Sequence, residues 1–199
     1  MMPPRKIIYV ITAKADSKRF KNKIFAQFDG ETLLERARRW CRNRPQVDGW
    51  QAVRVLATDS HDLAVLDGDE DYLTGLNSGD HIVNFKCACA VAGARPGDRC
   101  VLVQPSTPCR PDLPVRYLTS IGKDYFSASR PRGCAVWTQR DGYQRFTDAC
   151  IANGGWWIWT WPLPAEIFIN MYPVEYERDT FIDIDYSEDL DRLKKLSRA

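Results

Sequence analysis

The sequence predicts an α/β domain built on a central sheet with crossover connections. Its 199 residues, 44% hydrophobic and 27% charged, suit one globular domain with a sizeable core. Short β-branched apolar runs alternate along the chain with segments of helical spacing, which is the pattern of strands and helices in turn. Lys and Arg number 28 against 26 Asp and Glu, a net charge of +2 that excludes a general polyanion binder.

The first half of the chain predicts strand, loop, helix and strand in that order. Residues 5–11 are a short apolar run without alternation, typical of a strand buried on both faces of a parallel sheet. A polar loop follows, and residues 31–41 then place apolar side chains at helical spacing. The run 52–57 predicts a second strand, and residues 58–60 after it can cap a helix at 61–66.

The second half continues the alternation. A third central strand is expected at 100–103, between a helix at 87–94 and a helix at 114–121. The remaining expected elements are strands at 125–129 and 134–138, a turn that leads into an aromatic strand within 152–161, and a terminal helix at 187–197. No repeat or low-complexity linker marks a domain boundary.

The composition argues against a membrane protein and against a framework of disulfides or zinc. No apolar run approaches the roughly 20 residues that cross a bilayer, so we expect a cytoplasmic protein with no membrane partner and no nucleic-acid partner. The seven cysteines include no CxxC pair and have no His-x-x-x-His partner. They therefore favour free thiols over a disulfide framework or a zinc site.

Ligands of open α/β sheets bind at the carboxyl ends of the strands, so the loops there are the first places to look for a site. Residues 13–23, here called the basic loop, directly follow the first strand. The loop carries a hydroxyl on Ser17 and five cations, at Lys14, Lys18, Arg19, Lys21 and Lys23. With its backbone amides it could surround several phosphate oxygens, although it matches neither the Walker A nor the G-x-G-x-x-G pattern. The alternative is a solvated surface loop.

A pair of carboxylates lies late in the chain. Asp183 and Asp185 stand at i and i+2 on an extended segment, so they project from the same face and could chelate one hard divalent cation. In the alternative, Asp185 or Ser187 only caps the following helix and Asp183 is merely exposed. Combined with the basic loop, the pair points to a metal–triphosphate site.

A proline-flanked loop follows the third strand. Gln104, two hydroxyl residues and Arg110 offer an amide, hydroxyls and a guanidinium on a backbone that two prolines make rigid. A purely structural proline turn is the alternative.

Together these segments resemble one enzyme family. In that family a strand is followed by the motif A-R-x-G-S-K-R-x-P-x-K, which the basic loop matches in the same place. Residues 57–60 match a second motif, S-T-D-S. Residues 104–110 match Q-P-T-S-P-L-R, and residues 181–190 match P-I-D-I-D-x-x-x-D-L. In order and approximate spacing the chain resembles the cytidylyltransferases that activate acidic sugars as CMP conjugates, the acylneuraminate and CMP-KDO synthetase-like enzymes.

The resemblance implies a fold and a reaction. The fold is the three-layer α/β/α nucleotide-diphospho-sugar transferase fold, Rossmann-like and GT-A-like, with a mostly parallel central sheet. The reaction is transfer of CMP from CTP to the anomeric hydroxyl of an acidic sugar of the nonulosonate or ketodeoxy-octulosonate (KDO) type, with release of pyrophosphate. The partners implied are CTP and a small acidic sugar.

The resemblance also implies residue roles. Lys14 and Lys23 would be catalytic, holding the triphosphate and offsetting charge on the leaving pyrophosphate. Asp183 and Asp185 would hold Mg²⁺. The nucleotide would contact Ala13, Lys14, Ser17, Lys18, Arg19 and Lys23. The acceptor would contact Gln104, Pro105 and Ser106.

Three departures from the family pattern lie in the first motif or directly after it. Lys14 replaces an Arg and loses a bidentate phosphate fork, Asp16 adds a negative charge, and Ile24 stands for an Asn. These departures keep two alternatives open. One is a nucleotide-binding protein of the same fold with altered catalysis, and the other is a nucleotidyltransferase with a different nucleotide or a non-sugar acceptor.

The domain organisation follows from the same comparison. The stretch between Arg110 and Asp183 is short for a family that often carries a dimerising insertion there. We therefore expect a single domain over 1–199 with a small, shortened insertion at about 125–165. The sequence leaves open whether the protein forms a homodimer.

Overall fold

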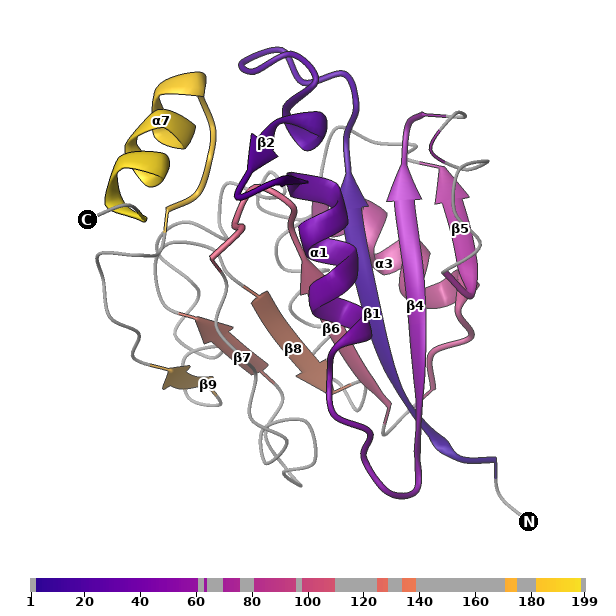
Figure 1. Ribbon diagram of the computed structural model, residues 1–199. Helices are drawn as coiled ribbons and strands as arrows, with labels where there is room; N and C mark the ends of the chain where they lie inside the picture. Colours follow the sequence, from indigo (N-terminus) through magenta and orange to yellow (C-terminus); the bar gives the residue numbers. More distant parts are fainter. Residues whose placement is uncertain are drawn as a thin grey trace.

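A seven-stranded sheet forms the centre of the computed structural model (Figure 1), in the order β5-β4-β1-β6-β8-β7-β9. The structure describes residues 3–60, 63, 70–75, 81–95, 98–109, 125–128, 134–138, 171–174 and 182–197. The predicted mostly parallel α/β architecture is confirmed in the half of the sheet that carries the loops of interest.

The parallel half of the sheet is built around its first strand. β1 (Arg5–Ala13) pairs in parallel with β4 (Trp50–Thr58) on one side and with β6 (Arg99–Val103) on the other. β5 (Tyr72–Gly75) extends this half in parallel at the outer edge. Their carboxyl ends consequently meet at one edge of the sheet, as in other open α/β sheets.

The other half of the sheet changes direction. β8 (Cys134–Thr138) runs antiparallel to both β6 and β7 (Tyr125–Ala128). β9 (Met171–Val174) pairs in parallel with β7 and ends the sheet.

Helices cover both faces of the parallel half, which gives three layers (Figure 1). α1 (Leu33–Arg42) lies in front of the sheet in this view and α3 (His81–Val91) lies behind it. On the α1 side, Tyr9 and Ile11 of β1 join Leu34 and Trp40 in one buried cluster. Residues 7–13 are all buried, which is what a strand covered by helices on both faces requires.

A small unit connects the first strand to the first helix. The 3₁₀ helix η1 (Lys23–Phe25) leads into a hairpin of β2 (Gln27–Phe28) and β3 (Glu31–Thr32). α7 (Ser187–Leu196) lies beside this hairpin, although it is the last helix in the sequence (Figure 1). A second buried cluster joins the hairpin and the start of α1 to the C-terminal segment. Phe28 and Leu33 contribute from the first side, and Ile184, Leu190 and Leu193 from the other.

Most predicted elements are confirmed within a few residues, with clear exceptions. α3 begins at His81, six residues before the predicted start at 87, and β2, β3, β5 and β9 were not predicted. Leu63 is helical, and its amide lies 3.5 Å from the Ser60 hydroxyl oxygen, consistent with the predicted cap. The predicted helix at 114–121 and the predicted turn and aromatic strand at 152–161 lie outside the described residues.

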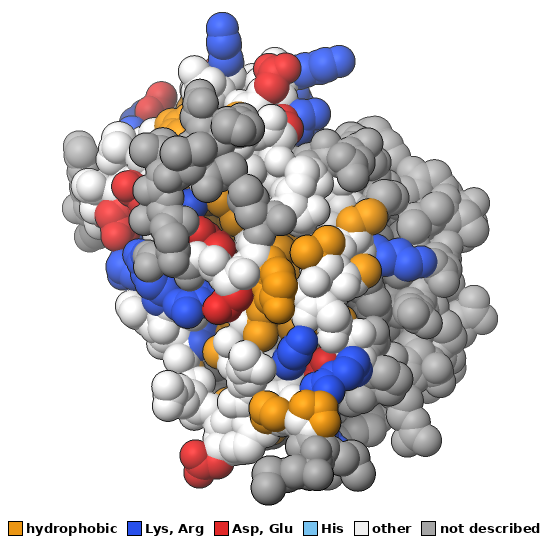
Figure 2. Space-filling view, turned by 90° about the vertical axis from the view of Figure 1, so that its right-hand side faces the viewer, with side chains coloured by type: hydrophobic (Ala, Val, Ile, Leu, Met, Phe, Trp, Pro, Cys, Tyr) orange, Lys and Arg blue, Asp and Glu red, His pale blue; other side chains and the backbone are white. Residues whose placement is uncertain are grey.

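The side of the molecule that carries β5 mixes apolar and charged groups on its surface (Figure 2). Among the exposed apolar residues of the molecule, Tyr72 belongs to β5 and Val91 to α3. Five cysteines are free thiols, namely Cys41, Cys87, Cys89, Cys100 and Cys109. None of the described helices has the length and apolar character needed to cross a membrane.

Candidate functional site

Two segments converge on the basic loop at the carboxyl ends of β1 and β6. They are residues 104–109, here called the proline loop, and residues 182–186, here called the aspartate segment. Ile184 N donates to Ser106 O at 2.8 Å, which joins the aspartate segment to the proline loop. Lys23 Nζ donates to Ile184 O at 2.7 Å, which joins it to the end of the basic loop. Three segments far apart in sequence are thus tied together through the backbone of Ile184.

Lys23 lies against the aspartate segment with most of its side chain buried. Its Nζ is 3.6 Å from Asp185 Oδ1 in addition to its bond to Ile184 O. Burial lowers the pKa of Lys23, while the nearby carboxylates of Asp183 and Asp185 act in the opposite direction. The amine is therefore fixed in place, with charges of opposite sign beside it.

Arg19 brings a second cation to the same carboxylate. Its Nη1 donates to Asp185 Oδ2 at 3.0 Å, and its guanidinium carbon lies 6.0 Å from the centre of the Tyr186 ring. About half of the Arg19 side chain is exposed, in contrast to Lys23. Arg19 is therefore the cation of this pair that can move at low cost.

The two aspartates of the segment share one side of the chain. Ile184 between them is fully buried, and alternation along an extended segment then turns Asp183 and Asp185 the other way. Both carboxylates act on the Lys23 amine. The same-side arrangement predicted from the i and i+2 spacing is consistent with this geometry.

The carboxylate of Asp189 caps the start of α7, a role that the sequence had suggested for Asp185 or Ser187. Asp189 Oδ2 accepts hydrogen bonds from Asp185 N at 2.9 Å and from Tyr186 N at 2.8 Å. Asp185 instead pairs with Arg19 and Lys23, so the interpretation of Asp185 or Ser187 as the capping side chain is wrong. Asp189 satisfies the amide groups at the start of the helix and fixes the backbone that carries Asp185.

The donor set at Asp183 and Asp185 suits a hard divalent cation. Mg²⁺ is usually bound through one or two carboxylates, with substrate phosphates and water completing its coordination. Among the described residues no group of three or more His, Cys, Asp or Glu side chains could hold a metal by itself. The two aspartates therefore fit an ion that arrives with a phosphate ligand better than an ion held by protein alone.

The proline loop is a tight turn directly after β6. Gln104 is buried, and its carbonyl accepts hydrogen bonds from the amide of Thr107 at 3.2 Å and from its hydroxyl at 2.9 Å. Pro105 is buried and Ser106 half-buried. The three residues predicted to contact the acceptor thus lie next to the aspartate segment, through the bond at Ser106.

The first part of the basic loop is held by Asp59, the residue directly after the neighbouring strand β4. Ala15 N donates to Asp59 Oδ1 at 2.7 Å, and Asp59 directly follows β4. Ser17 N donates to Ala15 O at 3.1 Å and continues the turn. The sequence suggested Asp59 as a helix cap and as part of the motif at 57–60, and its bond to the basic loop was missed.

The predicted nucleotide-binding residues differ in their surroundings. Ala13 is buried at the end of β1, Lys14 and Ser17 are half-buried, and Lys18 is exposed. Within the described part of the chain, Lys14 and Lys18 form no ion pair. The structure therefore brings Arg19 and Lys23 to the aspartates and leaves Lys14 and Lys18 available to an anion.

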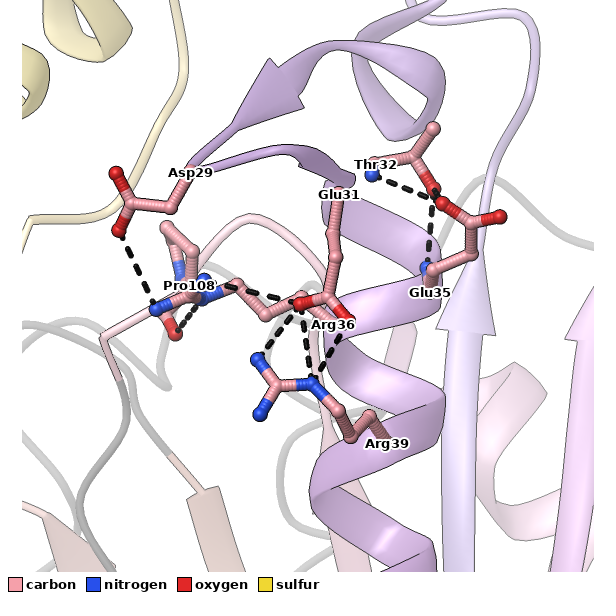
Figure 3. A network of polar contacts seen from close by, with 7 residues as sticks. All are labelled: Asp29, Glu31, Thr32, Glu35, Arg36, Arg39 and Pro108. Atoms are coloured by element: carbon pink, nitrogen blue, oxygen red, sulfur yellow. Dashed lines mark hydrogen bonds and ion pairs between the residues drawn. The ribbon is translucent and has the colours of Figure 1, made fainter.

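Arg36 supports the site from α1, and sequence reasoning missed it. Its Nε donates to Pro108 O at 3.1 Å, so α1 holds the far end of the proline loop (Figure 3). A signal for the hairpin beside it was present in the sequence, because the Asp-Gly pair at 29–30 favours a two-residue turn. Asp29 and Gly30 have φ of 49° and 80°, as such a turn requires.

No protein-family model matches the sequence, and no curated protein matches it at a significant level. Solved structures with the same fold do match it. A cytidylyltransferase from Leptospira borgpetersenii serovar Hardjo-bovis (strain JB197) is 16% identical, with a TM-score of 0.68 over 98% of this chain and 88% of that one. A CMP:2-keto-3-deoxy-manno-octonic acid synthetase complexed with CTP is 13% identical, with a TM-score of 0.64 over 98% of each chain.

A third similar structure holds a metal. The manganese complex of Rv0371c from Mycobacterium tuberculosis H37Rv is 14% identical, with a TM-score of 0.60 over 96% of this chain and 98% of that one. At these identities the comparisons establish the fold. The chain therefore has the three-layer, Rossmann-like fold of the nucleotidyltransferases, the group that its motifs resemble.

Proposed function

We propose that the protein is a nucleotidyltransferase that transfers CMP from CTP to the anomeric hydroxyl of an acidic sugar and releases pyrophosphate. One observation carries the proposal. The carboxylate of Asp185 lies against two cations of the basic loop, Arg19 and Lys23, while the same segment is bonded to the proline loop at Ser106. Groups suited to a metal, a triphosphate and a polar acceptor therefore adjoin one another at the carboxyl ends of the strands.

The triphosphate is the ligand that the basic loop suits best. In the proposal Ala13, Lys14, Ser17, Lys18, Arg19 and Lys23 contact the nucleotide. Lys14 and Lys23 act on the departing pyrophosphate, since fixed cations stabilise charge that develops in phosphoryl transfer. Lys23 is held by Ile184 O and Asp185 before any ligand binds, so its position is preorganised.

Asp183 and Asp185 hold the divalent cation in this proposal, with Mg²⁺ as the expected ion. When bound, the ion would neutralise triphosphate charge and polarise the phosphate oxygens that it contacts. The chain itself contributes two carboxylates whose backbone is fixed by Ser106, Asp189 and the burial of Ile184.

The acceptor lies at Gln104, Pro105 and Ser106 in this proposal, and is a sugar acid of the nonulosonate or KDO type. Its anomeric oxygen forms a bond to the α-phosphorus of CTP and loses its proton, and the bond to the β-phosphate oxygen breaks with its electron pair on pyrophosphate. The protein's work in such a step is positioning and electrostatic stabilisation.

The test measures pyrophosphate release from CTP and Mg²⁺ with a panel of sugar acids. Asp185→Asn removes the charge of a proposed metal ligand, and we expect turnover to fall by about 10²-fold or more. Asp191→Asn is the matched control, because Asp191 is exposed on α7 and outside the aspartate segment. Full turnover by Asp185→Asn would remove the metal assignment.

A second candidate is a protein of this fold that binds the nucleotide without turning it over. It is favoured by the Asp59 carboxylate, which accepts the hydrogen bond of the Ala15 amide in the basic loop, and by the exposed anion of Asp16. Calorimetry that shows CTP binding without turnover on any acceptor would support it. Thermal shifts with all four nucleoside triphosphates, with and without Mg²⁺, would identify another nucleotide specificity.

A further inference from the structure

We propose that Arg36 is a positioning residue that sets the conformation of the acceptor-binding proline loop from outside the site. The proposal rests on the proposed function, because it takes this loop to be the part that binds the acceptor. Nothing in the sequence motifs points to Arg36, which lies in the second turn of α1.

The guanidinium of Arg36 is held from several directions at once (Figure 3). Its Nε donates to Pro108 O at 3.1 Å, and its Nη2 and Nη1 lie 3.7 Å from Asp29 Oδ2 and 3.8 Å from Glu31 Oε2. The guanidinium carbon also lies 4.8 Å from the centre of the Phe28 ring. Its planar fork can satisfy these contacts together, which a lysine cannot do.

The surroundings of Arg36 make this arrangement stiff. Its side chain is only 21% exposed, and the Phe28 ring below it is 1% exposed. Phe28 belongs to the buried cluster that includes Ile184, and Cys109 of the proline loop packs against the same cluster. Arg36 therefore joins the hairpin to the proline loop over a rigid apolar base.

The proline loop is consequently held at two points. Ser106 O accepts from Ile184 N, which fixes the loop relative to the aspartate segment. Pro108 O accepts from Arg36 Nε, which fixes it relative to α1. Both carbonyls adjoin Thr107, which closes the turn on Gln104 O, so loss of either bond should loosen the turn that places Gln104 and Ser106. Loss of Arg36 should thus disturb acceptor binding and leave the basic loop intact.

The test compares Arg36→Met with Arg39→Met. Methionine keeps the length and the packing on Phe28 but cannot donate to Pro108 O. Arg39 is the matched control, because it lies on the same helix and bonds Glu31 at 2.6 to 3.0 Å without reaching the proline loop. We expect Arg36→Met to raise KM for the sugar acid about tenfold and to leave KM for CTP within about twofold. Arg36→Lys, which can still reach the carbonyl, should recover part of the loss.

A second readout does not depend on turnover. Hydrogen–deuterium exchange of the amides of Ser106, Thr107 and Cys109 should speed up severalfold in Arg36→Met and stay unchanged in Arg39→Met. If wild type turns over no acceptor in the panel, the proposed function has failed, and this exchange alone decides whether Arg36 positions the loop. Equal effects of Arg36→Met on both KM values, or unchanged exchange in the loop, would overturn the inference.

Discussion

The guanidinium of Arg19 lies 3.0 Å from Asp185 Oδ2, so a cation of the basic loop neutralises a carboxylate that we assign to metal binding. Both side chains are partly exposed, at 52% and 28%, and exposed ion pairs of this kind contribute only about 0.2–1 kcal/mol. Arg19 can therefore leave Asp185 at little cost when a divalent cation and a triphosphate arrive. Without ligands, Arg19 thus occupies the place beside Asp185 that the divalent cation would take in the proposed complex.

Replacing Arg19 should separate its pairing with Asp185 from its proposed contact with the phosphates of CTP. In Arg19→Gln the competing cation is gone, so Mn²⁺ should bind the nucleotide-free protein up to about fivefold more tightly, the equivalent of the ion pair that is lost. CTP should bind more weakly because one phosphate partner is missing. Titration of Mn²⁺ by electron paramagnetic resonance and of CTP by calorimetry measures both. Lys21→Gln is the control, and weaker Mn²⁺ binding in Arg19→Gln would contradict the assignment.

Lys23 should matter for stability as well as for turnover. Lys23→Met leaves the Ile184 carbonyl without its lysine donor and Asp185 without its buried cation, so we expect the free energy of unfolding to fall by about 1–3 kcal/mol. Lys21→Met, at an exposed position of the same loop, should change it by less than about 0.5 kcal/mol. Urea denaturation measures both variants, and equal effects would show that Lys23 does not hold the aspartate segment.

The parts predicted well from sequence are those where the local pattern and the fold agree. Residues 7–11 and 100–103 are apolar on both faces because helices cover the sheet on both sides, so composition alone identifies them as central strands. The aspartate pair could also be found, because the buried residue between Asp183 and Asp185 shows in the alternation.

What sequence reasoning missed depends on long-range pairing. β5 has only four residues and forms on the edge of β4. The start of α3 at His81 was missed, although Asp80 before it is of a type that favours the N-cap position. The roles of Asp59 and Arg36 follow from backbone groups that lie 44 and 72 residues away along the chain. A donor or acceptor in the backbone leaves no trace in the residue type of the partner, so such contacts appear only in the structure.

The capping box of α1 gives a pH-dependent prediction. Glu35 accepts hydrogen bonds from the amide and hydroxyl of Thr32, and these lower the pKa of Glu35 from its ordinary value of 4.5. The ionised carboxylate therefore stabilises the fold above that pH, and its contribution disappears as the pH falls through the lower folded pKa. Glu35→Gln should be less stable than wild type at pH 6, and the gap should shrink as the pH falls below the ordinary pKa of Glu35. Denaturation at several pH values tests this, and a gap that widens in acid would contradict it.

The N-cap itself can be tested separately. Thr32 Oγ1 accepts from Glu35 N at 3.1 Å, so Thr32→Ala should cost about 1 kcal/mol of unfolding free energy. Thr32→Ser retains the hydroxyl and should recover most of it. A serine variant as unstable as the alanine variant would show that the methyl group of Thr32, rather than the cap, is responsible.

The buried pair of Arg38 and Glu70 should be the most sensitive ion pair in the described part of the chain. Arg38 Nε lies 2.7 Å from Glu70 Oε1, with both side chains no more than 7% exposed. Arg38→Met removes the cation from a buried carboxylate and should cost about 3–5 kcal/mol, whereas the double variant with Glu70→Gln should recover part of this. Thermal denaturation of the two variants measures the difference, and a double variant no better than the single one would contradict the pairing.

Asp189 should control metal binding without touching the metal. Its carboxylate accepts hydrogen bonds from the amides of Asp185 and Tyr186, so Asp189→Ala frees the backbone that holds Asp185 in place. We expect Mn²⁺ affinity to fall by about tenfold, in the range seen when residues that orient metal ligands are removed. Asp191→Ala removes the same charge from an exposed position of the same helix and should leave the affinity within about twofold. Because both variants change the net charge equally, a similar loss in the two would mean that long-range charge, and not the fixed backbone of Asp185, sets the affinity.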